Sequence, residues 1–290
     1  MSVIVSNDGS QWKKPTAITT AGAIAAGSMA QGIFTSAGDL CVTPIMGKMR
    51  SINKGTDKVI ISQALKDALE KSGLKDKVEL VEFSSKNNYK NLAEFYKDFI
   101  KNFKTMTPLE RFSEMNMGLF REGFNAGFSP ILNQVLINTE KMGLAGFHEI
   151  GHAINFNNSK FWKGLHLYNA VKMPMALTTV LSLTALFKRK KAEGEQVHGL
   201  GDKTATFIKN NVGKLTLLTM IPVVAEEIKA TLRGNKLAKE LLSPENYNKV
   251  VKSNRLGAIT YVLLALFMSG GAYLANRIKD SIAKPTKVSE

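Results

Sequence analysis

The sequence predicts a mainly α-helical protein with a small β-sheet and about three transmembrane helices. Two observations support this fold class. The second half contains apolar runs of about twenty residues, and the first half combines helical periodicity with short strand-like segments. With 290 residues, the chain is long enough to bury a core without disulfides. Its single cysteine excludes both an intrachain disulfide and a cysteine-based zinc site.

An amino-terminal segment, residues 1–50, contains one weak apolar stretch. Residues 1–14 are polar and lack the basic start and apolar core of a cleavable signal peptide. Residues 16–40 are rich in Ala, Gly, Ser and Thr and carry no charge before Asp39. Because this stretch is only weakly hydrophobic, it could be a transmembrane or interfacial helix, or equally a soluble helix packed by small residues.

Residues 51–166 are predicted to form a soluble domain. Apolar residues at helical spacing predict a helix over residues 59–69, and a second amphipathic helix follows over residues 92–103. Residues 78–83 alternate between apolar and polar side chains, as in a half-buried strand. Thr107, which precedes a proline, predicts a capped helix start.

Residues 148–152 read His-Glu-Ile-Gly-His and form the most informative motif. The spacing places two imidazoles one turn apart on one helix face, where both can bind a single tetrahedral zinc ion. Glu149 would then act as general base, taking a proton from the attacking water and passing it to the leaving amine. The motif predicts a zinc peptidase, although an ordinary helix can match five residues by chance. Gly151 costs a helix roughly 1 kcal/mol relative to alanine, which points to close packing or a metal site.

Two patterns precede the motif. Phe120, Phe124 and Phe128 recur every four residues, which predicts one packed helix face. Residues 133–139 have the β-branched content and length of a short strand. In many zinc peptidases a strand shortly before the zinc helix binds an extended substrate at a sheet edge, but a purely structural strand is equally consistent with this pattern.

The composition changes after the motif. Residues 167–187 carry one charge, Lys172, and are long enough to cross a bilayer before the basic residues 188–191. A second, shorter apolar run covers residues 215–225. The two runs together predict a transmembrane helical hairpin over residues 167–230.

Residues 231–290 are predicted to be helical and to include a transmembrane helix over the uncharged residues 256–275. The alternative is a large soluble helical core. The formal charge of +15 arises from dispersed lysines and short clusters beside apolar runs, without a nucleic-acid-binding motif. This distribution favours anionic lipid head groups of a bilayer as the partner and argues against nucleic acid.

The two histidines leave a catalytic zinc ion one protein ligand short, because such sites usually hold three side chains. Glu226 and Glu227 end the second apolar run, where carboxylates are costly and therefore suggest function. If the first span leaves the motif side and the second returns, Glu227 reaches His148 and His152. Glu226 remains the alternative ligand.

Residues 133–234 resemble the integral-membrane gluzincins of the HtpX and CAAX-protease type. The motif, the two apolar segments and the sequence Glu227-Ile228-Lys229-Ala230 carry this resemblance. It implies that residues 51–166 form a zincin-like catalytic domain, that Glu227 is the third ligand of Zn²⁺, and that the substrate is a membrane-associated or misfolded polypeptide. It also implies an integral membrane protein, in a bacterial-type plasma membrane, whose catalytic side faces the cytoplasm.

The chain departs from the family at two points. Thr231 stands where the family has an aspartate, which puts the outer support of the metal ligands in question. The two clear spans that precede the catalytic domain in the family are missing, and at most residues 16–40 replace them. These departures keep open a zinc-binding membrane protein without hydrolytic activity. The basic charge, the Ala/Gly-rich start and the apolar helices keep open a non-enzymatic membrane-remodelling or pore protein.

Peptide hydrolysis also requires a donor that stabilises the oxyanion formed when water adds to the carbonyl. The available candidates in the sequence are Arg233, Tyr247, His166 and His198. Their spacing relative to the motif does not select one of them.

Overall fold

The structure, a computed structural model, describes residues 3–87 and 89–288 and is mostly helical, as predicted. The helices are α1 (Ala17–Asn53), α2 (Lys58–Lys71), α3 (Leu92–Asn102), α4 (Pro108–Arg121), α5 (Thr139–Met142), α6 (Gly146–Asn158), α7 (Lys160–Ala170), α8 (Met173–Phe187), α9 (Gly199–Leu241) and α10 (Pro244–Ile282). A 3-10 turn covers Gly143–Ala145. The strands are β1 (Val3–Val5), β2 (Gln11–Lys13), β3 (Glu79–Glu82), β4 (Gly127–Ser129), β5 (Gln134–Ile137) and β6 (Thr286–Lys287).

The chain folds into two compact units that are discontinuous in sequence. The terminal unit comprises Met1–Leu40, Lys172–Ile221 and Leu263–Glu290, and the motif unit comprises Cys41–Val171 and Pro222–Val262. Helices α1, α9 and α10 each contribute residues to both units. The compact units do not follow the order of the chain, because the end of α9 and the start of α10 group with the motif.

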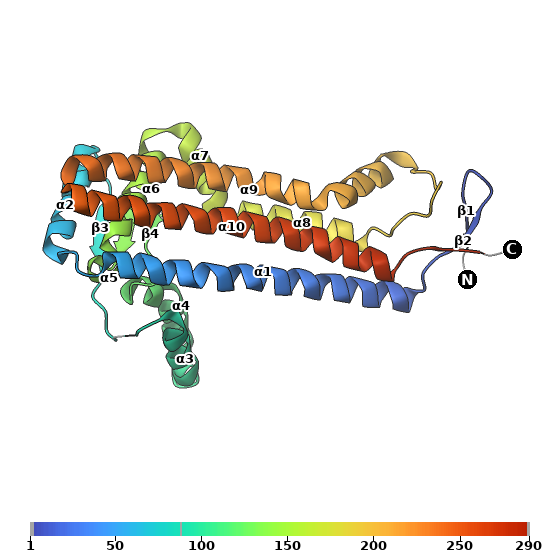
Figure 1. Ribbon diagram of the computed structural model, residues 1–290, viewed down its shortest axis with the longest axis horizontal. Helices are drawn as coiled ribbons and strands as arrows, with labels where there is room; N and C mark the ends of the chain where they lie inside the picture. The colour runs from blue at the N-terminus through green and yellow to red at the C-terminus, as the bar shows by residue number, and fades with distance from the viewer. Residues whose placement is uncertain (1–2, 88, 289–290) are drawn as a thin grey trace. The chain divides into compact units, whose positions relative to one another are not determined.

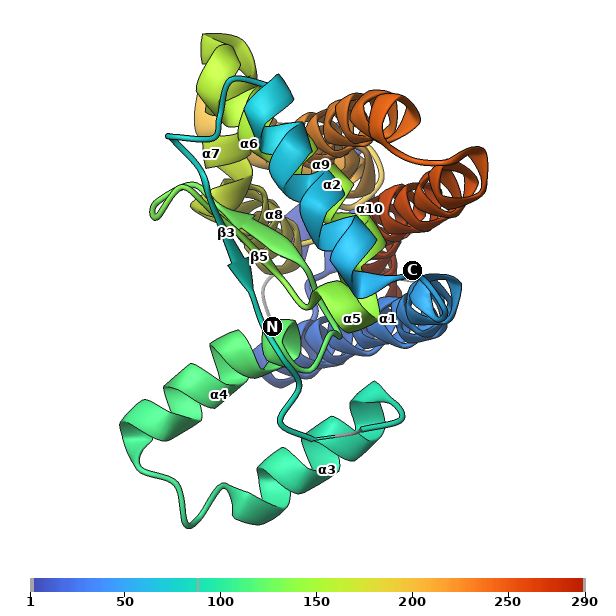
Figure 2. The same cartoon turned by 90° about the vertical axis from the view of Figure 1, so that its left-hand side faces the viewer.

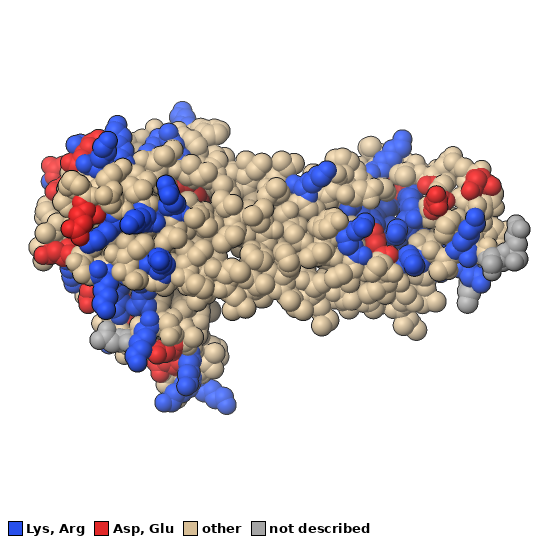
Figure 3. Space-filling view, viewed as in Figure 1, with Lys and Arg blue, Asp and Glu red and all other residues tan. Residues whose placement is uncertain are grey.

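In the terminal unit, segments of α1, α8, α9 and α10 lie side by side (Figure 1). Ala185, Val212 and Ala272 form a small core between α8, α9 and α10. Strands β1, β2 and β6 form an antiparallel sheet in the order β1-β2-β6. Most of the helix surface of this unit is uncharged in Figure 3, and Lys, Arg, Asp and Glu gather toward the end that carries β1 and β2.

Helices α1 and α10 are long and apolar enough to cross a membrane, which indicates membrane association. Helices α7 and α8 together meet the same test as a third span, but they are bent by 56° at their junction. The apolar run over residues 167–187 is thus divided between the end of α7 and α8. Lys172 has a left-handed backbone with φ of 58°, and Pro174 lies in the first turn of α8. Proline lacks the N–H that would continue the helix, so the chain starts a new one.

The motif unit contains a three-stranded sheet in the order β3-β5-β4, with β3 parallel and β4 antiparallel to β5. Its core joins Leu65 of α2, Phe147 of α6 and Val135 of β5 with Leu237 of α9 and Val250 of α10. Figure 2 shows α2 and α6 beside β3 and β5, while α3 and α4 project away from them. Because β5 is paired on both sides, the predicted strand before the motif is not a sheet edge.

Most local predictions for this unit are confirmed. The predicted strands correspond to β3 and β5, and the predicted helices correspond to α2 and α3. Thr107 caps α4 in a capping box with Glu110. The predicted helix face of three phenylalanines is wrong, because α4 ends before Gly123, whose φ is +65°, and Phe128 lies in β4. Glycine accepts this left-handed conformation at little cost, so the chain turns there.

Candidate metal centre

Helix α6, which carries the motif, crosses α9 with direct backbone contact. A Cβ atom at Gly151 of α6 would run into the carbonyl oxygen of Ala230, and a Cβ atom at Gly234 of α9 would run into that of Phe147. The close packing predicted from Gly151 is confirmed. Because small residues let two helix backbones approach, side chains at the ends of this contact are brought within bonding distance of one another.

Three buried ligand atoms converge beside this crossing. The Nε2 atoms of His148 and His152 are 3.0 Å apart, and the Oε2 atom of Glu227 lies 3.0 Å from the first and 3.3 Å from the second. With metal–ligand distances of about 2.0–2.1 Å, the ligand atoms of a tetrahedral zinc ion lie about 3.3 Å apart. This group of buried side chains could therefore hold a metal ion.

The opposite nitrogens of both imidazoles have their own partners. His152 Nδ1 lies 2.9 Å from Glu226 Oε1, and His148 Nδ1 lies 3.1 Å from Thr231 Oγ1. Asn155 Nδ2 donates to the same Glu226 oxygen at 2.8 Å. Such partners fix the tautomer that leaves Nε2 free to bind a metal. The geometry thus favours Glu227 as the metal ligand and Glu226 as the partner that orients His152. The Thr231 hydroxyl is placed to orient His148 in the same way.

A second buried group that could hold a metal ion consists of His152, His166 and Glu226. It uses the other side of the His152 ring, since Glu226 lies 2.8 Å from His152 Nδ1 and 3.4 Å from His166 Nδ1. The first group differs in one respect that matters for chemistry. His148 lines a cavity, so an ion held by the first group would face space for a further ligand.

This cavity, called the motif cavity below, has a volume of about 190 Å³ and lies within the motif unit. Helix α1, the region before β4, helix α5 and helix α10 all contribute to its wall. Its apolar lining includes Val42, Met46, Met49 and Met142, and its polar lining includes His148, Glu149, Asn254 and Tyr261. The predicted general base, Glu149, therefore faces the same space as His148, one of the three candidate ligands.

Burial and neighbouring charges shape the electrostatics of the motif. Burial raises the pKa of the Glu149 carboxyl above its usual value, and the rings of His148 and His152 oppose this effect only in part. For His152, burial lowers the pKa, but the carboxylates of Glu227 and Glu226 outweigh it and leave the pKa well above its usual value. The two carboxylates therefore favour positive charge at this point, as a metal site requires.

Of the four predicted oxyanion donors, two lie near the metal group. His166 and Arg233 are both on the Glu226 side, where the Glu226 carboxylate interacts electrostatically with Arg233. Tyr247 packs against the core, and His198 is exposed in the terminal unit. The structure instead brings Tyr261 to the cavity. The sequence signal that could have indicated Tyr261 is its hydroxyl within the predicted span 256–275. A polar group inside a bilayer costs free energy and therefore suggests function.

Comparison with protein-family models, curated proteins and solved structures finds no match. The candidate centre is therefore defined by its own geometry. Two imidazoles and a carboxylate place their ligand atoms at distances close to those around a tetrahedral zinc ion, and a hydrogen-bond partner holds the other nitrogen of each ring. One of the imidazoles, that of His148, lines a cavity.

Proposed function

We propose that this chain is a membrane-bound zinc metalloendopeptidase with a zincin-like catalytic domain, related to the integral-membrane gluzincins that the sequence resembles. The convergence of His148 Nε2, His152 Nε2 and Glu227 Oε2 beside the motif cavity carries the proposal. These three residues would hold Zn²⁺. The bound ion would supply Lewis-acid activation of water and polarisation of a peptide carbonyl.

The residues of the chain have separate tasks in this proposal. Glu149 takes the proton of the attacking water and delivers it to the leaving amine. Tyr261, which lines the same cavity as Glu149, donates its hydroxyl to the carbonyl oxygen as negative charge develops there. Glu226 and Thr231 hold the two imidazoles in their metal-binding orientation.

The cavity also limits the substrate. A cavity of 150 Å³ is large enough for benzene, so about 190 Å³ accommodates one large apolar side chain against Met46, Met49 and Met142. Strand β4 is an edge of the sheet and follows Asn125 and Ala126 of the cavity wall, so an extended polypeptide can pair with it there. A membrane-associated or misfolded polypeptide fits this arrangement. A cytoplasm-facing site in a bacterial-type plasma membrane remains a prediction.

Zinc content and peptidase activity of the purified protein in detergent test the proposal. Glu149→Gln should keep stoichiometric zinc and lose activity on an unfolded protein substrate, whereas His152→Ala should lose both. Glu70→Gln, at an exposed glutamate of α2, is the matched control and should lose neither. Stoichiometric zinc in His152→Ala would contradict the site.

The two alternatives give different results in the same experiment. Wild-type protein that binds zinc but leaves every polypeptide intact would support a metal-binding protein without hydrolytic activity. Zinc-free protein that permeabilises anionic vesicles would support a non-enzymatic membrane protein.

A further inference from the structure

A second cavity of the motif unit is strongly basic. This basic cavity, of about 540 Å³, lies between the end of α1, the segment before α3, and α5. The charged residues of its wall are Arg50, Lys54, Lys90, Lys141 and Glu140. Within residues 3–87 and 89–288, none of these four cations forms an ion pair with a carboxylate. The wall therefore keeps most of its positive charge.

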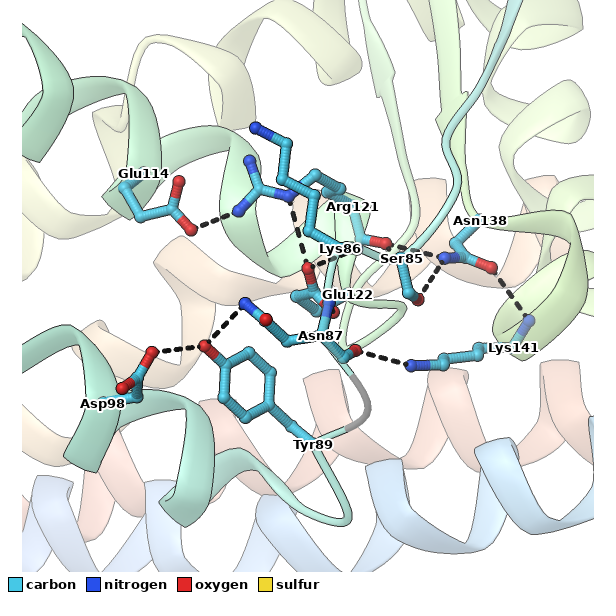
Figure 4. Close-up of polar contacts among 10 residues, drawn as sticks. All are labelled: Ser85, Lys86, Asn87, Tyr89, Asp98, Glu114, Arg121, Glu122, Asn138 and Lys141. Atoms are coloured by element: carbon cyan, nitrogen blue, oxygen red, sulfur yellow. Dashed lines mark hydrogen bonds and ion pairs between the residues drawn. The ribbon is translucent and has the colours of Figure 1, made fainter.

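Neutral groups hold the two innermost cations in place. The guanidinium of Arg50 donates to the carbonyl oxygen of Tyr89 at 3.3 Å and stacks 4.1 Å from the ring centre of Phe124. Lys141 Nζ donates to the carbonyl oxygen of Asn87 at 3.3 Å (Figure 4). Carbonyl oxygens and an aromatic face orient a cation without cancelling its charge. Burial, together with the charge of Arg50, lowers the pKa of Lys141, and the carboxylates of Glu122 and Glu140 offset this effect only in part.

The backbone that presents these carbonyl groups is itself fixed. Glu122, which is fully buried, accepts hydrogen bonds from the backbone N–H groups of Lys86 at 3.1 Å and Asn87 at 3.3 Å (Figure 4). Arg121 Nε donates to the same carboxylate at 3.2 Å. The hydroxyl of Tyr89 donates to Asp98 at 2.6 Å. These hydrogen bonds hold Asn87 and Tyr89, whose carbonyl groups orient the two cations.

Packing fixes the stem of Lys141 as well. Gly123 has φ of +65°, and a Cβ atom there would lie 2.5 Å from the Cβ atom of Lys141. The absence of a side chain at Gly123 lets the lysine pass along the turn toward the cavity. Packing of its stem against Gly123 therefore directs the Lys141 ammonium group into the wall of the basic cavity.

We propose that the basic cavity binds a phosphate group, carried either by an anionic phospholipid head group or by a soluble phosphate. Arginine presents a fork of N–H donors that matches phosphate oxygens, and lysines add point charges around it. Ser51 and Thr56 supply hydroxyl groups in the same wall. Helix α1, whose last turns line the cavity, is a candidate membrane span, and basic residues at the end of a span attract anionic head groups.

The basic cavity adjoins the motif cavity. Met46 of α1 lines both, so an occupied phosphate site would restrain one wall of the space that Glu149 faces. The binding proposal itself does not depend on peptidase activity, because it rests on residues outside the metal centre.

Binding to the full-length protein in nanodiscs of neutral phosphatidylcholine tests the proposal. The two probes, titrated separately by calorimetry, are inorganic phosphate and dihexanoyl phosphatidic acid below its micelle concentration. Removing one charge-assisted contact, in Arg50→Gln or Lys141→Gln, should weaken binding about 10- to 100-fold. Lys77→Gln, at an exposed lysine outside the cavity, should leave the dissociation constant unchanged.

Each outcome is informative. Binding of both probes that depends on Arg50 and Lys141 supports a general phosphate site, and binding of the lipid alone identifies the head group as the source. If neither probe binds, or if Lys77→Gln weakens binding as much as Lys141→Gln, the proposal is wrong. Lys54→Gln, at an exposed lysine of the wall, provides the same comparison if a substitution at Arg50 prevents folding.

Discussion

The backbone contact between α6 and α9 predicts opposite effects for two glycine-to-alanine substitutions. Alanine is favoured over glycine inside a helix by about 1 kcal/mol. Gly164 of α7 has open space around its missing side chain, so Gly164→Ala should stabilise the protein by about that amount. At Gly151 the new methyl group meets the Ala230 carbonyl oxygen, a backbone atom that cannot move aside by rotating a side chain. Overpacking of this kind costs about 1–3 kcal/mol.

The two variants should therefore differ by about 1–3 kcal/mol in the free energy of unfolding, with Gly151→Ala the less stable. One kcal/mol corresponds to about 2–4 °C in Tm for a domain of 150–250 residues. Thermal unfolding in detergent, followed by circular dichroism, gives the comparison directly. Zinc content of the folded variant adds a second readout, because separation of α6 from α9 also separates His148 from Glu227. An equal rise of Tm in both variants would refute the close crossing.

The remaining predictions concern the metal centre and its cavity. Glu227→Gln should abolish stoichiometric zinc binding, whereas Glu226→Gln, which alters the partner of His152 Nδ1 and leaves Glu227 in place, should weaken zinc affinity about 10- to 100-fold. Competition with a chelator distinguishes the two variants, and the reverse order would make Glu226 the ligand. Thr231→Val should weaken zinc binding about tenfold in the same assay, while Thr231→Ser, which keeps the hydroxyl, should not. Equal zinc affinities of the two variants would mean that the 3.1 Å contact does not hold the His148 ring in its metal-binding orientation. Tyr261→Phe should lower kcat about 10²- to 10³-fold with unchanged zinc content, and a kcat near that of wild type would exclude it as oxyanion donor.

Local sequence patterns predicted much of the motif unit. The helices over residues 59–69 and 92–103, and the strands over residues 78–83 and 133–139, follow from periodicities that short-range sterics and capping impose. The capped start at Thr107 depends on side chains within one turn. The three phenylalanines were misassigned because their spacing fits a helix, whereas the left-handed turn at Gly123 interrupts it.

Features set by distant segments were harder to predict. Whether β5 is an edge or a central strand depends on β3 and β4, which flank it from different parts of the chain. The bend at Lys172 arises from Pro174, whose effect the hydrophobicity of residues 167–187 conceals.

The sequence by itself determined the motif helix, its two imidazoles and the carboxylate between them, because four-residue spacing fixes which side chains share a helix face. It also restricted the third ligand to Glu226 or Glu227. Only the tertiary structure gave these neighbours different partners, since adjacent residues of a helix point about 100° apart and the crossing at Gly151 decides which imidazole nitrogen each one meets. The same crossing gave Thr231 its place beside His148, and packing of α10 brought Tyr261 to the cavity, because contacts between segments far apart in the chain leave no local pattern in the sequence.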